Sequence, residues 1–164
     1  MPIAIIFNYT SVHILQKAGG NPFYQPALPN SSRLYAIRNT QANNFPFYIG
    51  TADNIQNRFV PRVDAVRQFG FRNADIANVS IAIIQIFVNG IASPPHNNGV
   101  SSGIDVEHLL IRLYISQGHN VRNISKTAVF TNNHGTSLNC TFMNPANWAE
   151  FIPANTNVLA GGNV

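Results

Sequence analysis

Charged residues and cysteines are scarce in this sequence. Only 10% of its 164 residues are Asp, Glu, Lys or Arg, against about a quarter in an average soluble domain, so Asn, Ser, Thr and Gln must solvate most of the surface. The single cysteine, Cys140, excludes an internal disulfide framework and a zinc site built from several cysteines.

The first residues of the sequence do not have the pattern that predicts a targeting or membrane-spanning segment. Residues 1–7 carry no basic leader, and their apolar run is too short for a signal peptide or a membrane span. We therefore expect no membrane partner and a cytoplasmic site of action, with any export following a route that needs no signal peptide.

Apolar residues are plentiful, at 45%, and the net charge is +4. This length and composition predict one domain, residues 1–164, with a buried core. The positive excess permits a phosphate-bearing partner, because cationic side chains that neutralise phosphates release counterions. Four arginines of the first half are candidate nucleic-acid contacts: Arg33, Arg38, Arg62 and Arg67.

The segment from Arg33 to Arg58 is predicted to form the central structural unit of the domain. Apolar and polar residues alternate at 34–37, and an aromatic run at 45–49 precedes Gly50, which we expect to end the second strand. A polar, Asn-rich turn joins the two strands. A short helix carrying Arg58 should follow, and Pro61 should end it, because proline removes an amide donor and clashes with the preceding turn.

Two further elements are predicted after this segment, and one turn is predicted before it. Val79 to Val88 is the most apolar run and is rich in β-branched residues, which predicts a central buried strand. A helix is expected from Val106 to Gln117, with Gly118 as its terminator. Near the start, a turn at Asn8 to Thr10 should separate two short strands, and the last ten residues should be frayed.

These elements predict an α/β (α+β) fold with a small central mixed or antiparallel three-stranded sheet flanked by helices. Residues 33–123 would form the core of the domain. Residues 1–32 and 124–164 would be β-rich extensions at its two ends.

The order of Tyr35, then Tyr48-Ile49-Gly50, then Arg58 resembles the GIY-YIG nuclease family. Arg33 stands where the family has its leading glycine. The resemblance extends to the second helix, where Glu107 matches the family's metal-binding glutamate and Asn120 a later asparagine. It implies a metal-dependent endonuclease that hydrolyses DNA phosphodiester bonds, with Mg²⁺ (or Mn²⁺) held at Glu107.

The chemistry of phosphodiester hydrolysis gives each of these residues a role. Tyr35 is the candidate general base and Tyr48 the hydrogen-bonding partner of substrate or attacking water. Arg58 would neutralise charge on the phosphate. Mg²⁺ binds through one or two carboxylates, which suits a single Glu107. Asn120 would brace the site rather than react.

Several biological settings and two other functions stay open. The resemblance covers restriction enzymes and toxins, so a homodimer and a cognate immunity protein are candidate partners besides DNA. A non-catalytic nucleic-acid-binding module would use the same arginines without Glu107. A His-Asn-His nuclease would instead use His96 and His119.

Overall fold

One large sheet dominates the protein. The structure, a computed structural model, describes residues 1–14, 16–18, 21–24, 33–39, 47–55, 79–96, 98–144 and 146–164. The strands of the large sheet are β1 (Ile3–Ile14), β4 (Arg33–Asn39), β5 (Phe47–Ala52), β6 (Val79–Val88), β7 (Ile91–Ala92), β10 (Leu138–Met143) and β11 (Thr156–Val158).

The other described elements lie outside this sheet. Two small antiparallel pairs are formed by β2 (Gln16–Ala18) with β3 (Asn21–Tyr24) and by β8 (Val100–Ser101) with β9 (Ile104–Asp105). The helical elements in the described residues are the α-helix α3 (Val106–Ser116) and the 3₁₀-helix η2 (Ala146–Phe151). No candidate membrane-spanning helix is found in this part of the chain.

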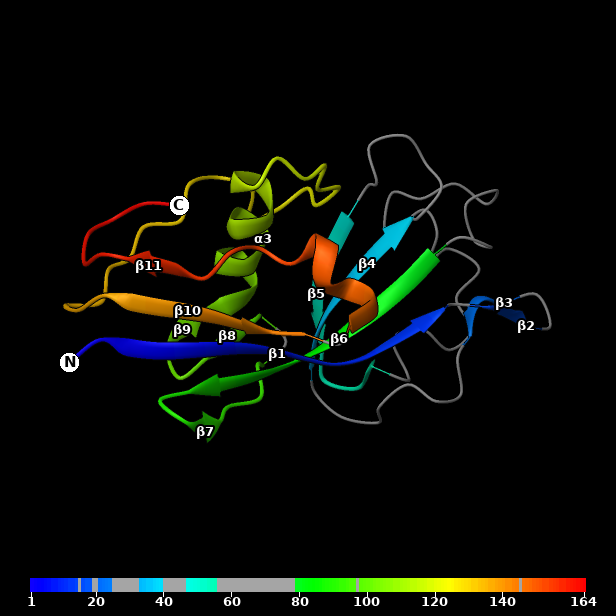
Figure 1. Cartoon of the computed structure of the whole chain (residues 1–164), viewed down its shortest axis with the longest axis horizontal. Coiled ribbons are helices and arrows are strands. Elements are labelled where there is room, and N and C mark those ends of the chain that lie inside the picture. Colours follow the sequence, from blue (N-terminus) through cyan, green and yellow to red (C-terminus); the bar gives the residue numbers. More distant parts are fainter. Residues whose placement is uncertain are drawn as a thin grey trace.

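The large sheet is mixed and curls as it twists (Figure 1). Its strand order is β11-β10-β1-β6-β4-β5, and β7 pairs with β6 beside this path. β1 and β10 run parallel, whereas the other neighbours are antiparallel. β5 therefore lies at one end of the strand order, and β11 lies at the other.

The sequence of each central strand explains its burial. In β1, Ile5, Phe7 and Tyr9 are buried at every second position, as expected of a strand with one face on the core. The register against β6 shifts between Tyr9 and Ser11. In β6, residues 80–84 are all buried, so both faces of this strand are covered, which the continuous apolar run predicts.

Helix α3 covers one face of the sheet. The Asp105 side chain caps its first turn by accepting a hydrogen bond from the His108 amide at 2.9 Å. Beyond its end, Gly118 has φ +83°, a left-handed conformation that favours glycine. The helix packs six buried side chains into the core with strand residues such as Ile49 and Ile84: Val106, Leu109, Leu110, Ile111, Leu113 and Tyr114.

The predicted fold class was wrong. The large sheet has seven strands rather than three, and within the described residues a single α-helical element, α3, packs on it rather than several flanking helices. The segments predicted as extensions supply β1, β10 and β11 to this same sheet. The physical reason is that β1 pairs along its length with β6 and, in parallel, with β10. Such long-range pairing leaves no local sequence pattern.

Several boundaries also differ from prediction. Gly50 lies inside β5 rather than at its end. The predicted turn at Asn8 to Thr10 is a register irregularity within one continuous β1. The chain end is not frayed, because Phe130 and Val164 exchange two backbone hydrogen bonds of 3.0 and 2.9 Å. The helix predicted to carry Arg58 lies mostly outside the described residues.

Candidate functional site

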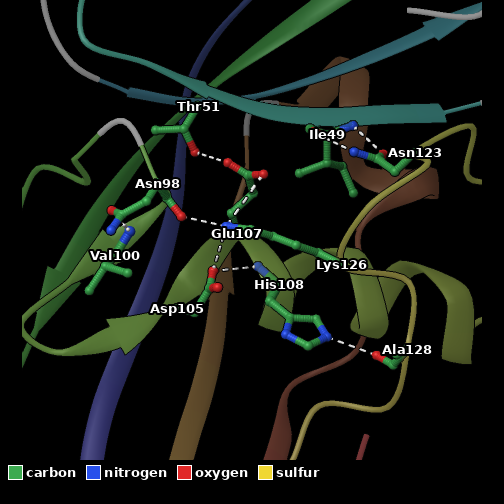
Figure 2. A network of polar contacts seen from close by, with 10 residues as sticks. All are labelled: Ile49, Thr51, Asn98, Val100, Asp105, Glu107, His108, Asn123, Lys126 and Ala128. Carbon is green, nitrogen blue, oxygen red and sulfur yellow. Dashed lines mark hydrogen bonds and ion pairs between the residues drawn. The ribbon is translucent and has the colours of Figure 1, made fainter.

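Glu107 lies against the strand that contains Tyr48-Ile49-Gly50. It is the second residue of α3, and its Oε2 accepts a hydrogen bond from the hydroxyl of Thr51, the residue after Gly50 in β5 (Figure 2). Its amide donates to the Gly99 carbonyl at 3.2 Å. The acidic residue predicted as the metal ligand is therefore next to the predicted Tyr-Ile-Gly strand.

The Lys126 ammonium lies among three oxygen atoms at this site. It donates to the Asn98 carbonyl and, at 3.1 Å, to Asp105 Oδ1, and it lies 3.7 Å from Glu107 Oε1 (Figure 2). A lysine ammonium has three donors, so these acceptors match its capacity. The Lys126, Asp105 and Glu107 side chains are 23%, 32% and 14% exposed. No local sequence pattern marks Lys126 as a member of this site.

The loop before α3 approaches Glu107 closely at Gly99. This glycine has φ +79°, and a Cβ placed on it would overlap the Cβ of Glu107. Glycine is required here both for the backbone conformation and for the space. The close approach brings the Asn98 carbonyl to Lys126.

Asn123 braces the outer edge of β5. Its side-chain oxygen accepts from the Ile49 amide at 3.0 Å, and its side-chain nitrogen donates to the Ile49 carbonyl at 2.7 Å (Figure 2). A side-chain amide has both a donor and an acceptor, so it pairs with a strand edge as a peptide would. The predicted Asn120 acts here through its backbone, since its carbonyl accepts from the Phe47 amide at 2.7 Å.

Tyr35 and Tyr48 lie together, as predicted. Tyr35 is paired with Gly50 across β4 and β5, and its ring centroid lies 6.4 Å from that of Tyr48, with the rings 24° apart. A Cβ at Gly50 would overlap the Tyr35 hydroxyl, so Gly50 provides the space for the phenol. Tyr35 is 1% exposed, whereas Tyr48 is half-buried.

The tyrosines and Glu107 belong to opposite faces of β5. Successive side chains of a strand point to opposite faces. Ile49 packs in the core with α3, and Thr51 contacts Glu107, so Tyr48 and Gly50 belong to the other face with Tyr35. Glu107 and the two tyrosines therefore all lie at β5, the end strand of the sheet, but on opposite faces of it.

The predicted arginines have different surroundings. Arg58, Arg62 and Arg67 lie outside the described residues. Arg33 begins β4 and is paired with Ala52. The Arg38 guanidinium stacks on aromatic rings, 3.9 Å from the Phe151 centroid and 4.7 Å from that of Trp148, and burial lowers its pKa.

Aromatic residues surround the other end of α3. The Tyr9 and Tyr114 hydroxyls are 2.7 Å apart, and the Trp148 indole donates to the Tyr114 hydroxyl at 3.2 Å. Burial raises the pKa of Tyr114 to about 12 and raises that of Tyr9 well above its usual value. The His119 ring lies 4.7 Å from the Phe47 ring, and burial lowers its pKa.

The two histidines of the alternative nuclease lie at opposite ends of α3. His96 accompanies β8, which leads through β9 into the start of the helix, since its amide donates to the Val100 carbonyl at 3.1 Å. His119 follows the helix end. A helix of 11 residues is about 16 Å long at 1.5 Å per residue, so one metal ion does not contact both histidines.

A cavity opens beyond the end of β5. It has a volume of about 470 Å³, and its walls include Asp53, two residues after Thr51, and the loop that leads to Gly99. The lining residues are Asp53, Ser93, Pro94, Pro95, His96 and Ser102. Asp53 and His96 are the ionisable residues among them.

The atoms around Lys126 have the chemistry of a hard-cation site. They are carboxylate oxygens of Asp105 and Glu107 and the Asn98 carbonyl, with the Thr51 hydroxyl beside them, and Mg²⁺ prefers oxygen ligands. No group of three or more His, Cys, Asp and Glu side chains suited to a metal occurs within the described residues. The donor set fits an ion held by few protein ligands and otherwise by water and substrate.

A scan against protein-family models, a search of curated proteins and a search of solved structures each find no match to this chain. The resemblance to the GIY-YIG nucleases therefore rests on the residues of the sequence and their order.

Proposed function

We propose that this protein is a magnesium-dependent endonuclease that hydrolyses DNA phosphodiester bonds. The observation that supports the proposal is the contact between Glu107 and Thr51, which joins the acidic residue of α3 to the strand carrying Tyr48-Ile49-Gly50. Asn123 holds the same strand by both backbone groups of Ile49. Three segments, β5, the start of α3 and the stretch after α3, thus meet at β5.

Glu107 and Asp105 would hold the metal ion, with the Thr51 hydroxyl orienting the Glu107 carboxylate. A bound Mg²⁺ supplies charge that polarises the phosphate and stabilises the departing oxygen. Thr51 occupies one carboxylate oxygen of Glu107 and leaves the other facing Lys126. The hydrogen bond fixes the rotamer of the carboxylate, which a preorganised site requires.

Tyr48 is the phenol placed to contact substrate or the attacking water. A general base must come within hydrogen-bond reach of the proton it accepts, and Tyr48 is half-buried whereas Tyr35 is 1% exposed. We assign proton transfer to this pair, with Tyr35 positioning the Tyr48 ring. β5 ends the strand order, and the segment 120–123 covers its edge at Phe47 and Ile49, so a substrate would have to reach the Tyr48 and Glu107 faces around the far end of β5, beyond Thr51.

Arginines would supply the positive charge that the substrate requires. Arg58 is assigned to the scissile phosphate, and Arg33, Arg62 and Arg67 to neighbouring phosphates, where a guanidinium can bind two oxygens at once. Arg38 is better suited to holding η2 than to DNA, since its guanidinium stacks on two rings there.

A plasmid-nicking assay tests the proposal. Purified protein is incubated with supercoiled DNA and Mg²⁺, with and without chelator, as wild type, Glu107→Gln, Tyr48→Phe and Tyr35→Phe. We expect nicking in Mg²⁺ that chelator stops, and a fall of roughly 100-fold or more for Glu107→Gln and Tyr48→Phe. Binding to DNA should survive in both variants.

The sequence offers a matched control for this assay. Glu150 is the other glutamate of the chain and is exposed, so Glu150→Gln makes the same chemical change elsewhere and should cleave as wild type does. A wild type that does not nick DNA, or a Glu107→Gln variant as active as wild type, would contradict the nuclease proposal. Discrete fragments would favour a restriction-type enzyme, and a smear a toxin-type enzyme with an immunity protein as partner.

A non-catalytic nucleic-acid-binding module is the second candidate. The ion pair between Lys126 and Glu107 favours it, because it gives the carboxylate a structural partner inside the chain. In that case DNA binding would be insensitive to chelator, no strand would be cut, and Glu107→Gln would leave binding unchanged.

A further inference from the structure

We propose that the Lys126 ammonium occupies the cation position beside Glu107 and must leave it when a divalent ion binds, so that Lys126 sets the metal affinity of the site. This inference rests on the proposed function, because it concerns the same carboxylate. It adds a residue that regulates the site from within the chain.

The first argument is the set of atoms that surrounds the ammonium. Its partners are the Asn98 carbonyl, Asp105 Oδ1 at 3.1 Å and Glu107 Oε1 at 3.7 Å. Two carboxylates and a carbonyl make the kind of oxygen cluster that binds hard cations. The lysine nitrogen is the point on which these three oxygens converge (Figure 2).

The second argument is electrostatic. An ammonium and a divalent ion cannot share the same few oxygen atoms, because like charges a few ångströms apart repel strongly in a partly desolvated site. The Lys126 and Glu107 side chains are 23% and 14% exposed, so solvent screens this repulsion only in part. Metal binding is therefore coupled to withdrawal of Lys126.

The third argument is that the two carboxylates have partners other than Lys126. The carboxylate of Asp105 is tied to the first turn of α3 through His108, and that of Glu107 is tied to Thr51. Lys126 lies between α3 and β10, outside both elements. Its flexible stem can carry the charge into solvent without moving α3.

Titration with Mn²⁺ alone tests the inference without DNA. Free Mn²⁺ is followed by electron paramagnetic resonance as it is added to full-length wild type, Lys126→Met and the double variant Lys126→Met with Glu107→Gln. Removal of the competing charge should lower the Kd for Mn²⁺ by roughly tenfold or more. The double variant should lose this gain.

Lys17→Met is the matched control, because Lys17 and Lys126 are the two lysines of the chain. The control changes the net charge equally, but at β2, which lies at the end of the molecule opposite β8 and β9 (Figure 1). Its Kd should equal that of wild type. A Lys126→Met variant that binds Mn²⁺ no more tightly than wild type, or whose gain persists without Glu107, would overturn the inference.

A measurement on the wild type covers the case in which Lys126→Met does not fold. With lysine labelled by ¹⁵N at Nζ, the chain gives two side-chain signals. Addition of Mg²⁺ should shift the Lys126 signal and speed its exchange with water, while the Lys17 signal stays constant. An unchanged Lys126 signal at saturating Mg²⁺ would overturn the inference.

The two proposals fail in different ways. If Lys126→Met gains Mn²⁺ affinity through Glu107 but no variant cuts DNA, the cation exchange stands and the nuclease proposal falls. If DNA is cut in a Glu107-dependent reaction while Lys126→Met leaves the Kd unchanged, the nuclease proposal stands and the exchange falls.

Discussion

The two ends of α3 are built from opposite chemistry. At its start, Asp105 and Glu107 share the Lys126 ammonium, and their side chains keep 14–32% of their exposure. At its end, Tyr114 joins Tyr9 and Trp148 in a network with almost no exposure. β5 passes both ends, with Thr51 at the ionic network and Phe47 against the Tyr114 ring.

This difference separates a region that can exchange partners from one that cannot. A partly exposed ion pair has a net value of about 0–1 kcal/mol, because water competes for each charge. A buried hydrogen-bonded network has no such competitor, so losing one member leaves another unsatisfied. We therefore assign ligand exchange to the start of α3 and stability to its end.

The largest effect is expected for Trp148→Ala, which should lower the free energy of unfolding by about 3–5 kcal/mol, as for other buried aromatic residues. Trp148 is 0% exposed and has its ring 6.4 Å from that of Phe47. Urea denaturation followed by far-ultraviolet circular dichroism measures this loss of unfolding free energy. Trp148→Phe, which keeps a ring and loses the indole donor, should cost less. A loss below about 1 kcal/mol would show that this end of α3 is not the stabilising one.

A smaller effect is expected for Tyr9→Phe, which removes the hydroxyl bonded to Tyr114 and should cost about 1–2 kcal/mol. Because the network is buried, the loss should be the same in low and high salt. Lys126→Met at the other end should cost less, and its cost should shrink with salt, since screening weakens exposed pairs. Denaturation curves at two salt concentrations compare the variants, and equal salt dependence would remove the distinction.

The smallest effect is expected for His119, through the pH dependence of the free energy of unfolding. Burial lowers its pKa in the folded state, so the unfolded chain binds more protons at mildly acidic pH. The free energy of unfolding should be at its full value above the unfolded pKa and should fall as the pH drops below about 6.5. His119→Asn should reduce this slope. Burial also lowers the pKa of His13, so His13 should retain part of this slope in the variant. An unchanged slope in the variant would contradict the assignment.

Elements with a strong local signal were predictable from the sequence. The apolar run of β6 and the left-handed Gly118 after α3 were confirmed. The antiparallel pairing of β4 with β5 was also confirmed, with Gly50 inside the second strand and opposite Tyr35. In each case the residues that determine the element are neighbours in the chain.

Features that depend on distant segments were not predictable. The parallel pairing of β1 with β10 has no counterpart in either strand's own sequence. At the site, Asn123 rather than Asn120 contacts Ile49 through its side chain, because the segment after α3 runs along β5 in a register that spacing does not define. Lys126 was not predictable because its acceptors, at residues 98, 105 and 107, lie well before it in the chain.

The parallel pairing of β1 with β10 has a consequence for biosynthesis. β1 is made before the other strands of this sheet, yet one of its two neighbours, β10, is among the last strands to be made. Until then, one edge of a long apolar strand has no native partner, and such edges invite aggregation. Completion of this sheet must therefore wait until translation has passed Val158, the last residue of β11.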